Sequence, residues 1–461
     1  MIRIKHDNQN VKKEIFEFLR IKFPSYERNN LMDVDIKVSD NYKINIKFKE
    51  FSKFIVVRKV NDLKLQKILI KQELYKALSP YFENKDEWGI LTGVRPIKLI
   101  LQLLEDNDEF KTKLILREKY LLNDDLIKYL LDIAKRESKI IYPIDRDSYS
   151  IYIHIPFCPS KCSYCSFQTL IYNSEISKIY VTELIEELKR ESIFFTKPPK
   201  TVYIGGGTPT SIGVKLLRNI IDTVGSYYGV SEEFTVECGR PDTINEEMLL
   251  MLKEMGINRI SINPQSMNEC TLKNMGRNHS MEDIYRAYEL SRKIGFFCIN
   301  MDLILGLPGE SLEDNRTSLN KIIKLGPENI TVHTLSVKNG SKLFDEKYMN
   351  NVSINRAIEY TKNITLNSGY FPYYLYRQKR MLGSGENIGY CKEGFESMYN
   401  ILMMEEKQSI IGFGMSSSSK FFYPELKKVE SVMNFRNMKD YVERNSEIYS
   451  KKIKQYKNFN F

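Results

Sequence analysis

Residues 149–165, YSIYIHIPFCPSKCSYC, decide the fold that this sequence encodes. The apolar run at 150–157 has the length and the isoleucine content of a buried strand, and three cysteines follow it at once. Further apolar runs come later in the chain, separated by amphipathic helical patterns such as those at 177–192 and 281–295. These runs are residues 201–207, 234–239, 259–264, 298–308 and 329–337. Six strand-then-helix units therefore predict a parallel sheet with covering helices.

The predicted fold class is α/β, with the six units forming a partial (β/α)6 barrel of the TIM type. Right-handed crossovers curl such a sheet into an open barrel, and ligand sites then lie at the C-terminal ends of the strands. We expect an N-terminal α/β domain at 1–140 and the barrel core at 149–345. A C-terminal extension at 346–461 is expected to complete the substrate side.

The two flanking regions have patterns of their own. Residues 32–60 alternate apolar and polar side chains around two turn signals, which predicts two or three antiparallel strands. Amphipathic helices are expected at 65–82, 97–110 and 124–138. From Arg436 onward, seven Lys and Arg stand against three Asp and Glu, and we expect a solvated helix.

Composition describes an ordinary globular protein. The 461 residues are 42% hydrophobic and 28% charged, which excludes a disordered or collagen-like chain. The net charge of 69 − 59 = +10 is spread among both signs, so nucleic acid is not indicated. No run approaches the ~20 apolar residues of a membrane span, and the polar start carries no signal region. We therefore expect a cytoplasmic protein, in which an odd count of seven Cys argues against a disulfide framework.

Three of those cysteines, Cys158, Cys162 and Cys165, lie in one short loop and can surround a single metal centre. Three thiolates satisfy three irons of a [4Fe–4S] cluster and leave the fourth iron open to a small ligand. A structural zinc would need a fourth ligand, for which His154 is the nearest candidate. Iron–sulfur, zinc and incidental cysteines are therefore the three interpretations of the loop alone.

A glycine run, Gly205-Gly206-Gly207-Thr208-Pro209, follows the next expected strand. Glycine lets a backbone come close to a ligand and expose N–H groups, which can meet a carboxylate. A tight strand-to-helix turn would use glycine as well. The position one strand after the cysteines favours a ligand role.

The spacing CxxxCxxC followed by GGGTP resembles the radical S-adenosylmethionine (SAM) superfamily. Within it, YIHIPFC, GGGTPT, GRNHS and DLILGLPGE resemble the oxygen-independent coproporphyrinogen III oxidase (dehydrogenase) family. LTGVRPIK, VECGRPDTI, SINPQSM and YYLYRQKRMLG resemble its HemZ branch. The resemblance implies a [4Fe–4S] cluster, one or two SAM molecules and a 5′-deoxyadenosyl radical. It also implies an activity in haem biosynthesis, the oxidative decarboxylation of two propionates of coproporphyrinogen III to vinyl groups, giving protoporphyrinogen IX.

The resemblance assigns roles to individual residues. It implies that the cluster is ligated by Cys158, Cys162 and Cys165. It implies that the cluster-bound SAM is contacted by Tyr152, Gly206 and Glu237. It also implies a catalytic role for Tyr152 and Glu237. It implies a second nucleotide site formed by Tyr164, Gly207, Thr208, Gln265, Arg277 and Asp302. Taken singly, these residues have plain alternatives: the acids can cap helices, and Arg277 can pair with Asp302 in a salt bridge that only shapes the mouth.

A substrate with four propionates calls for cations and aromatic walls. We expect these from a set near the family motifs: Arg95, Arg377, Lys379 and Arg380 beside Tyr373, Tyr374 and Tyr376. The alternative for this set is a solvated basic surface.

The sequence departs from the family in two places. Phe167 stands where decarboxylating members carry a fourth Cys, and haem-chaperone relatives carry a motif H-N-x-x-Y-W where this chain has residues 386–391, ENIGYC. A carboxylate is a poorer haem ligand than imidazole, which weakens the chaperone interpretation. A haem-binding chaperone-like protein, or another tetrapyrrole-modifying radical SAM protein, is the alternative function.

The expected partners are a tetrapyrrole substrate and an electron donor such as a flavodoxin or a ferredoxin. We expect no nucleic acid partner, no membrane partner, and a monomer.

Overall fold

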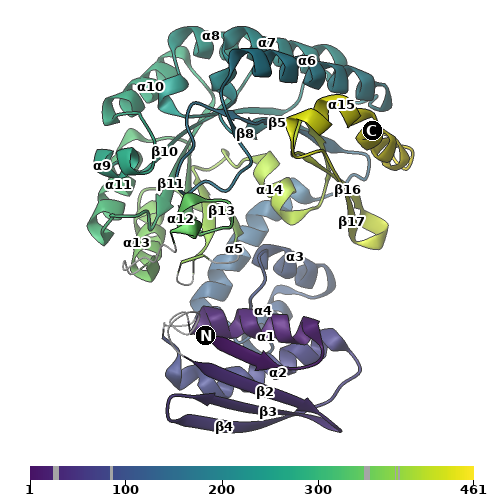
Figure 1. Cartoon of the computed structure of the whole chain (residues 1–461), viewed down its shortest axis with the longest axis vertical. Coiled ribbons are helices and arrows are strands. Elements are labelled where there is room, and N and C mark those ends of the chain that lie inside the picture. Colours follow the sequence, from purple (N-terminus) through teal and green to yellow (C-terminus); the bar gives the residue numbers. More distant parts are fainter. Residues whose placement is uncertain (24–30, 84–86, 347–353, 379–380, 383–384) are drawn as a thin grey trace. The chain divides into compact units, whose positions relative to one another are not determined.

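The computed structural model describes the chain except residues 24–30, 84–86, 347–353, 379–380 and 383–384 (Figure 1). The described chain divides into two compact units: residues 1–135 with Gly385 form the first, and residues 136–382 with 386–461 form the second. Among the described residues, no helix is long and apolar enough to cross a membrane.

The first unit is built on a four-stranded sheet in the order β1-β2-β3-β4. Its strands are β1 (Ile2–Lys5), β2 (Met32–Val38), β3 (Asn41–Phe48) and β4 (Phe51–Arg58). β2, β3 and β4 pair antiparallel, which confirms the predicted hairpins. β1 pairs parallel with β2 and was not predicted, because four residues are too few for a clear alternation.

Helices accompany this sheet along the first part of the chain. They are α1 (Gln9–Lys22), α2 (Leu63–Leu78), α3 (Pro96–Asp106), α4 (Glu109–Glu118) and α5 (Asp124–Ile141). α1 and α2 lie over one face of the sheet (Figure 1), and alternate residues of β3, Tyr42, Ile44, Ile46 and Phe48, are buried. α2, α3 and α5 confirm the three predicted helices.

The second unit contains the six predicted parallel strands as neighbours in one sheet of the described chain. They are β5 (Tyr149–Ile155), β8 (Thr201–Gly206), β9 (Glu233–Gly239), β10 (Arg259–Gln265), β11 (Cys298–Leu305) and β12 (Asn329–Thr334). Each pairs in parallel with the next in chain order. The α/β class and the (β/α)6 partial barrel are confirmed.

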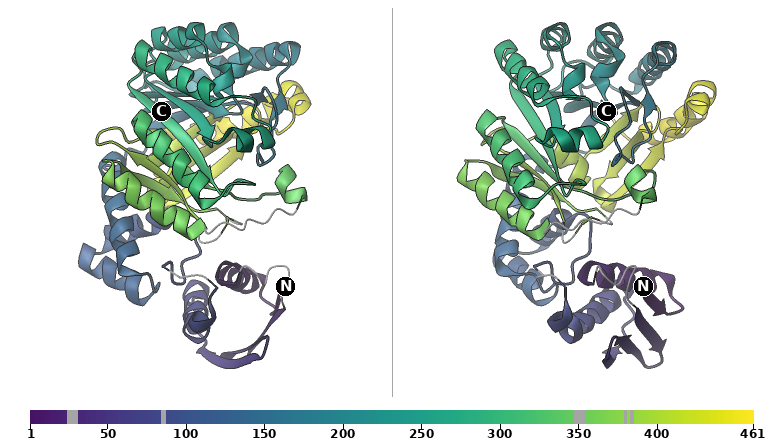
Figure 2. Two further views of the ribbon diagram at one scale, coloured as in Figure 1. Left: turned by 90° about the vertical axis from the view of Figure 1, so that its left-hand side faces the viewer. Right: turned by 60° about the vertical axis from the view of Figure 1, so that its left-hand side comes forward.

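Helices connect these strands and line the outer side of the curved sheet (Figures 1 and 2). They are α6 (Ser174–Glu191), α7 (Val214–Tyr228), α8 (Glu246–Glu254), α9 (Glu269–Asn274), α10 (Met281–Ile294) and α11 (Leu312–Leu325). α10 and α11 begin at capping boxes, with Ser280 and Ser311 as N-caps, and both end at a left-handed glycine. These signals terminate the helices on either side of β11. A two-stranded pair, β6 (Phe157–Cys158) with β7 (Leu170–Ile171), brackets the cysteine loop.

The remaining strands extend the parallel sheet at both of its edges. β14 (Asn387–Cys391) pairs antiparallel with β12 and is followed outward by β13 (Phe371–Tyr376). At the other edge β15 (Ser409–Phe413) pairs in parallel with β5 and is followed by β16 (Ser418–Tyr423) and β17 (Lys428–Met433). The helices of this segment are α12 (Lys342–Asp345), α13 (Ile354–Asn367), α14 (Met398–Glu405) and α15 (Met438–Tyr456). Both segments belong to the second compact unit, and the predicted separation of core from extension stays a prediction.

The solvated helix expected from Arg436 onward is wrong in one respect, because α15 buries a charged side chain. Lys452 is fully buried, and its Nζ donates to Glu187 Oε1 at 3.0 Å and to Glu191 Oε1 at 3.1 Å. It also donates to the carbonyl oxygen of Gly412 in β15 at 2.8 Å. One ammonium thus joins α15, α6 and β15. A count of charges along the tail cannot show which lysine faces inward.

We expect Lys452→Ala to lower the free energy of unfolding by about 3–5 kcal/mol, because it leaves two buried carboxylates without their cation. Urea unfolding followed by circular dichroism measures the change. Lys451→Ala, at the exposed neighbouring position, is the control. Equal effects of the two substitutions would contradict the role given to Lys452.

Candidate functional site

A cavity of about 360 Å³ opens at the C-terminal ends of the six parallel strands. One wall is the cysteine loop that follows β5, and the floor is formed by the ends of β8 to β12. All but one of the predicted site residues line it: Cys158, Cys162, Cys165, Tyr164, Gly206, Gly207, Thr208, Glu237, Gln265, Arg277 and Asp302. Residues far apart in sequence therefore meet at one site, as the strand-end argument predicts.

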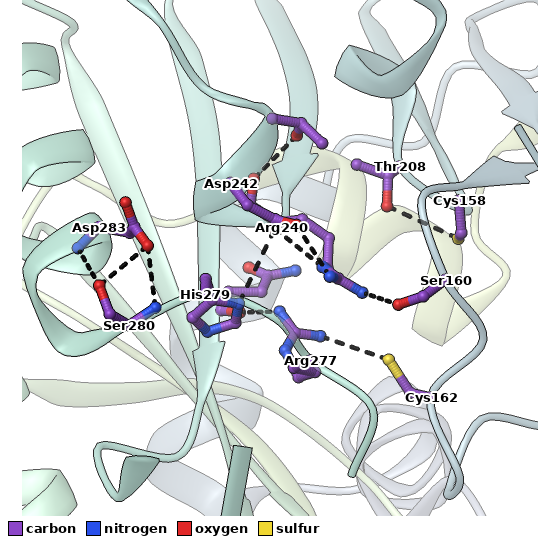
Figure 3. Close-up of polar contacts among 12 residues, drawn as sticks. Cys158, Ser160, Cys162, Thr208, Arg240, Asp242, Arg277, His279, Ser280 and Asp283 are labelled. Atoms are coloured by element: carbon purple, nitrogen blue, oxygen red, sulfur yellow. Dashed lines mark hydrogen bonds and ion pairs between the residues drawn. The ribbon is translucent and has the colours of Figure 1, made fainter. Parts of the chain in front are cut away.

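The cysteine loop is held in place by the turn between α9 and α10. Ser160 Oγ donates to the carbonyl oxygen of Gly276 at 2.8 Å, and the N–H of Ser163 donates to the carbonyl oxygen of Met275 at 3.1 Å. Two donors are directed at sulfur atoms (Figure 3): Thr208 Oγ1 lies 3.6 Å from Cys158 Sγ, and Arg277 Nη1 lies 3.9 Å from Cys162 Sγ. These contacts within the protein anchor the loop.

The donor set fits an iron–sulfur cluster. The three cysteines are free thiols of one loop facing one cavity, and hydrogen-bond donors to sulfur are a recurring feature of such centres. Burial raises the pKa of Cys158 to about 11 and also raises the pKa of Cys165, so binding a metal centre would release their protons. In the described part of the chain, no three His, Cys, Asp or Glu side chains are already gathered tightly enough to hold a metal ion.

The glycine run provides close approach, and its N–H groups bond within the protein in the described structure, while their contact with a ligand carboxylate stays a prediction. The N–H groups of Gly207 and Thr208 donate to the carbonyl oxygens of Ile155 and Phe157, each at 2.7 Å. The N–H of Gly206 donates to Glu237 Oε2 at 3.4 Å. These groups are therefore satisfied within the protein.

No side chain fits at these glycines. Gly206 has φ +112°, and a Cβ there would lie 2.6 Å from His154 Nδ1. A Cβ at Gly207 would lie 2.4 Å from the carbonyl oxygen of Phe157 and 3.0 Å from Cys158 Sγ. The run is required for strand β8 to pass directly beneath the cysteine loop.

Glu237 is a carboxyl group with an altered proton affinity. Burial and the nearby carboxylate of Asp302 raise its pKa to about 7, although Gly206 N–H and Asn263 Nδ2 donate to it. Near neutral pH this group can therefore exist as a carboxylate, which accepts hydrogen bonds, or as an acid, which donates one.

Tyr152 is the predicted site residue that is absent from the described cavity lining. A hydrogen bond of 3.1 Å joins its hydroxyl to His154 Nδ1, and its ring lies 6.3 Å from that of Tyr203, which does line the cavity. Burial lowers the pKa of His154 to about 4, so its imidazole is neutral. The role of Tyr152 stays a prediction.

Gln265 and Arg277 present polar groups without partners in the described structure. Gln265 ends β10 with φ +69°, a strained value for a residue with a side chain, and its buried Oε1 makes no hydrogen bond. Arg277 is buried and donates to Tyr164 Oη at 3.0 Å, while its Nε has no partner. Strain and unsatisfied polar groups at one place are typical of a ligand site.

The alternative of an Arg277–Asp302 salt bridge does not describe the contacts found. Asp302 Oδ1 accepts from Asn300 Nδ2 at 2.7 Å, and its Oδ2 lies 3.7 Å from His333 Nε2. Asn263, His333 and Lys338 also line the cavity, although sequence reasoning gave them no role there. A signal for Asn263 was available in the sequence. It stands two residues before Gln265 on the same strand, so the alternation of strand residues places both side chains on the same side of the sheet.

Arg240 is a further residue that sequence reasoning missed. It lies directly after β9, three residues beyond Glu237, and it belongs to the cavity lining although only 3% of the residue is exposed. The motif VECGRPDTI contained it, but nothing in the sequence showed that its side chain turns toward the cysteine loop.

The cationic and aromatic set expected for the substrate is only partly at the cavity. Tyr374 and Tyr376 line it with near-parallel rings 6.3 Å apart, whereas Tyr373 and Arg377 are buried and not among its described lining. Arg95 belongs to the first unit, and residues 379–380 lie outside the described residues.

At the position of the chaperone motif, Glu386 is buried and pairs with Lys362 Nζ at 3.1 Å, while the next residue, Asn387, lines the cavity.

Comparisons with known proteins agree with this site. The model of the radical SAM superfamily matches residues 152–322. The oxygen-independent coproporphyrinogen-III oxidase-like protein HemZ of Bacillus subtilis is 41% identical over 387 residues, covering 80% of this chain and 76% of that protein. The heme chaperone HemW of the same organism is 37% identical over 193 residues, covering 41% of this chain and 51% of that protein.

The solved structure described as the coproporphyrinogen III oxidase HemN from Escherichia coli, a radical SAM enzyme, shares the fold. Its TM-score is 0.54 at 20% identity, over 68% of this chain and 72% of that one. The fold and the cysteine-lined cavity thus define a radical SAM protein. The chain belongs to the family of oxygen-independent coproporphyrinogen III oxidase-like proteins, in its HemZ branch. Membership of the superfamily implies a [4Fe–4S] cluster and SAM.

The pKa of Glu237 leads to a test by stability. Between pH 4.5 and about 7 the folded chain keeps a proton on Glu237 that the unfolded chain has released, so rising pH favours unfolding in this window. Glu237→Gln removes this effect. Relative to the wild type, the variant should gain about 3 kcal/mol of unfolding free energy from pH 4.5 to pH 7 and no more above it.

Urea unfolding at a series of pH values measures this difference, and Glu232→Gln, at an exposed position outside the cavity, is the control. A difference for Glu237→Gln that does not change with pH would show that its carboxyl titrates alike in the folded and unfolded chain.

Proposed function

We propose that this chain is a radical SAM enzyme that decarboxylates two propionates of coproporphyrinogen III, giving protoporphyrinogen IX. The observation that carries the proposal is the convergence of a three-thiol loop and a set of nucleotide-contact candidates on one cavity at the strand ends. Two relatives support the substrate class through their names, coproporphyrinogen III oxidase and its oxidase-like homologue.

In this proposal Cys158, Cys162 and Cys165 hold the cluster and leave one iron open. When bound, the cluster supplies the single electron that splits SAM into methionine and a 5′-deoxyadenosyl radical, and a flavodoxin or a ferredoxin is the electron donor we propose. Thr208 Oγ1 and Arg277 Nη1 stabilise the sulfur atoms by hydrogen bonds.

Glu237 orients the SAM that binds next to the cluster. Its carboxylate lies beside Gly206, directly under the cysteine loop, and can accept from an ammonium or a ribose hydroxyl. Gly206 contributes space for the ligand, since its N–H is already bonded to Glu237. The hydroxyl of Tyr152 fixes the orientation of the neutral His154 side chain by a hydrogen bond.

A second nucleotide site is proposed in the same cavity. Its residues are Tyr164, Gly207, Thr208, Gln265, Arg277 and Asp302. Arg277 can donate to a carboxylate and Asp302 can accept from a hydroxyl or an ammonium. The unpartnered Nε of Arg277 and Oε1 of Gln265 support this site, because both gain hydrogen bonds when a polar ligand enters.

The rim of the cavity suits a tetrapyrrole with carboxylate arms. Phe167 is 64% exposed and, with Tyr374 and Tyr376, offers aromatic surface to the pyrrole rings of a flexible macrocycle. Lys338 is half-buried in the same lining and supplies a positive charge for a propionate. Each propionate would become a vinyl group by losing carbon dioxide, a hydrogen atom to the 5′-deoxyadenosyl radical and one electron to an external electron acceptor.

A haem-binding chaperone-like function is the second candidate. The imidazole of His333 lines the cavity and is a common ligand of haem iron, although the H-N-x-x-Y-W motif is lacking. Relatives named heme chaperone HemW support this candidate.

The cluster assignment predicts that anaerobic reconstitution gives about four irons per chain and an absorbance near ~400 nm. Cys162→Ser should lose most of both, because serine is a poor ligand for iron in such clusters. Cys270→Ser, at an exposed cysteine outside the loop, is the matched control and should keep them. Equal iron in Cys162→Ser and the wild type would overturn the ligand assignment.

The two candidate functions predict different products. Anaerobic incubation of the reconstituted chain with coproporphyrinogen III, SAM and a reductant should give a product lighter by two carboxyl groups, seen by mass spectrometry. Retained haem with unchanged porphyrinogen would instead establish the chaperone-like function. Omission of SAM is the control for the oxidase reaction.

A further inference from the structure

Arg240 is a buried cation that faces the cysteine loop and that the proposed function does not use. Its Nε and Nη2 donate to the two oxygens of Asp242, each at 2.9 Å, in a bidentate ion pair. Its Nη1 donates to Ser160 Oγ at 2.8 Å (Figure 3). Ser160 lies between Cys158 and Cys162, so this guanidinium reaches the centre of the loop.

The two members of the ion pair are not equally close to the cysteine loop. Arg240 touches Ser160 directly, whereas Asp242 lies on the far side of the guanidinium, toward His279 (Figure 3). Although burial alone would raise it, the hydrogen bonds and the charge of Arg240 hold the pKa of Asp242 below its usual value. Burial, followed by the charge of Arg277, lowers the pKa of His279 to about 4. At neutral pH the cation nearest to Asp242 is therefore Arg240.

Ser160 links the ion pair to the loop backbone. Its oxygen accepts from Arg240 while its own proton goes to the carbonyl oxygen of Gly276. The loop is thereby held between the end of β9 and the turn before α10. Arg240 lines the same cavity as the three cysteines. A side chain placed only to brace the fold would not need to lie there.

We propose that Arg240, whose charge is compensated by Asp242, is a positioning residue. It fixes the cysteine loop and sets the reduction potential of the cluster that the loop binds. This inference rests on the proposed cluster. Reduction adds a negative charge to the cluster, and a nearby cation stabilises the reduced form, while a nearby carboxylate opposes it. The net effect of the pair on the reduction potential depends on which of the two charges lies closer to the cluster. Arg240 is the closer one.

The two halves of the pair therefore act in opposite directions. Arg240→Gln leaves Asp242 as an uncompensated negative charge and shifts the midpoint potential to more negative values. Asp242→Asn leaves the guanidinium uncompensated and shifts it to more positive values. Arg240→Lys keeps the positive charge and holds the potential closer to that of the wild type than Arg240→Gln does.

The experiment uses the full chain after anaerobic reconstitution. A redox titration followed by electron paramagnetic resonance gives the midpoint potential, and iron and sulfide analysis gives the cluster content. Thermal unfolding of the iron-free variants reports on the fold. Arg218→Gln is the matched control, since its ion pair with Glu254 at 3.2 Å joins α7 to α8 on the outside of the barrel.

Opposite shifts for Arg240→Gln and Asp242→Asn, with an unchanged potential in Arg218→Gln, support the inference. Shifts in the same direction, or no shift in variants that hold a full cluster, overturn it. Loss of the cluster in both variants together with a lower unfolding temperature also overturns it, because the pair would then only brace the fold. A wild-type chain that assembles no cluster overturns the proposed function, and with it this inference.

Discussion

Parallel pairing from β8 to β12 is the constraint on which the site depends. The register places Ser261 opposite Glu237, and Asp302 opposite Thr331, so the strand ends carry their polar side chains to one level. Because neighbouring parallel strands present the same end to the same edge, residues separated by whole βα units meet without any long loop. The cysteine loop then needs only to lie across this edge, and its hydrogen bonds to residues 275 and 276 keep it there.

Much of this arrangement could be predicted from the sequence. Apolar runs of strand length alternate with amphipathic helices, so the number and direction of the six parallel strands followed from periodicity and from the handedness of crossovers. The cavity residues were implied by the resemblance to a known family, and their meeting at one site agrees with the placement of ligand sites at strand ends. The partners of the glycine N–H groups could not be predicted, since the carbonyl oxygens of Ile155 and Phe157 reach them from a different segment of the chain. Composition also gave no means of separating buried Lys452 from its exposed neighbours.

Buried ion pairs occur at two places in the second unit. At the cavity, Arg240 and Asp242 satisfy each other two residues apart, which keeps a guanidinium beside the thiols. Away from it, Lys452 serves two glutamates of α6 and a carbonyl oxygen of β15. The desolvation of such groups is offset only when every partner is present. Specific geometry, rather than added stability, is what these pairs contribute, and a sequence pattern carries no signal for it.

The pairing of β15 with β5 has a consequence for biosynthesis. β5 is the first strand of the barrel to leave the ribosome, and the strand that covers its outer edge is encoded only at residues 409–413. Until that segment is made, the nascent sheet has a bare edge of unpaired N–H and C=O groups, the kind of surface on which chains join one another. Association of growing chains at this edge is therefore a hazard until residues 409–413 have been made.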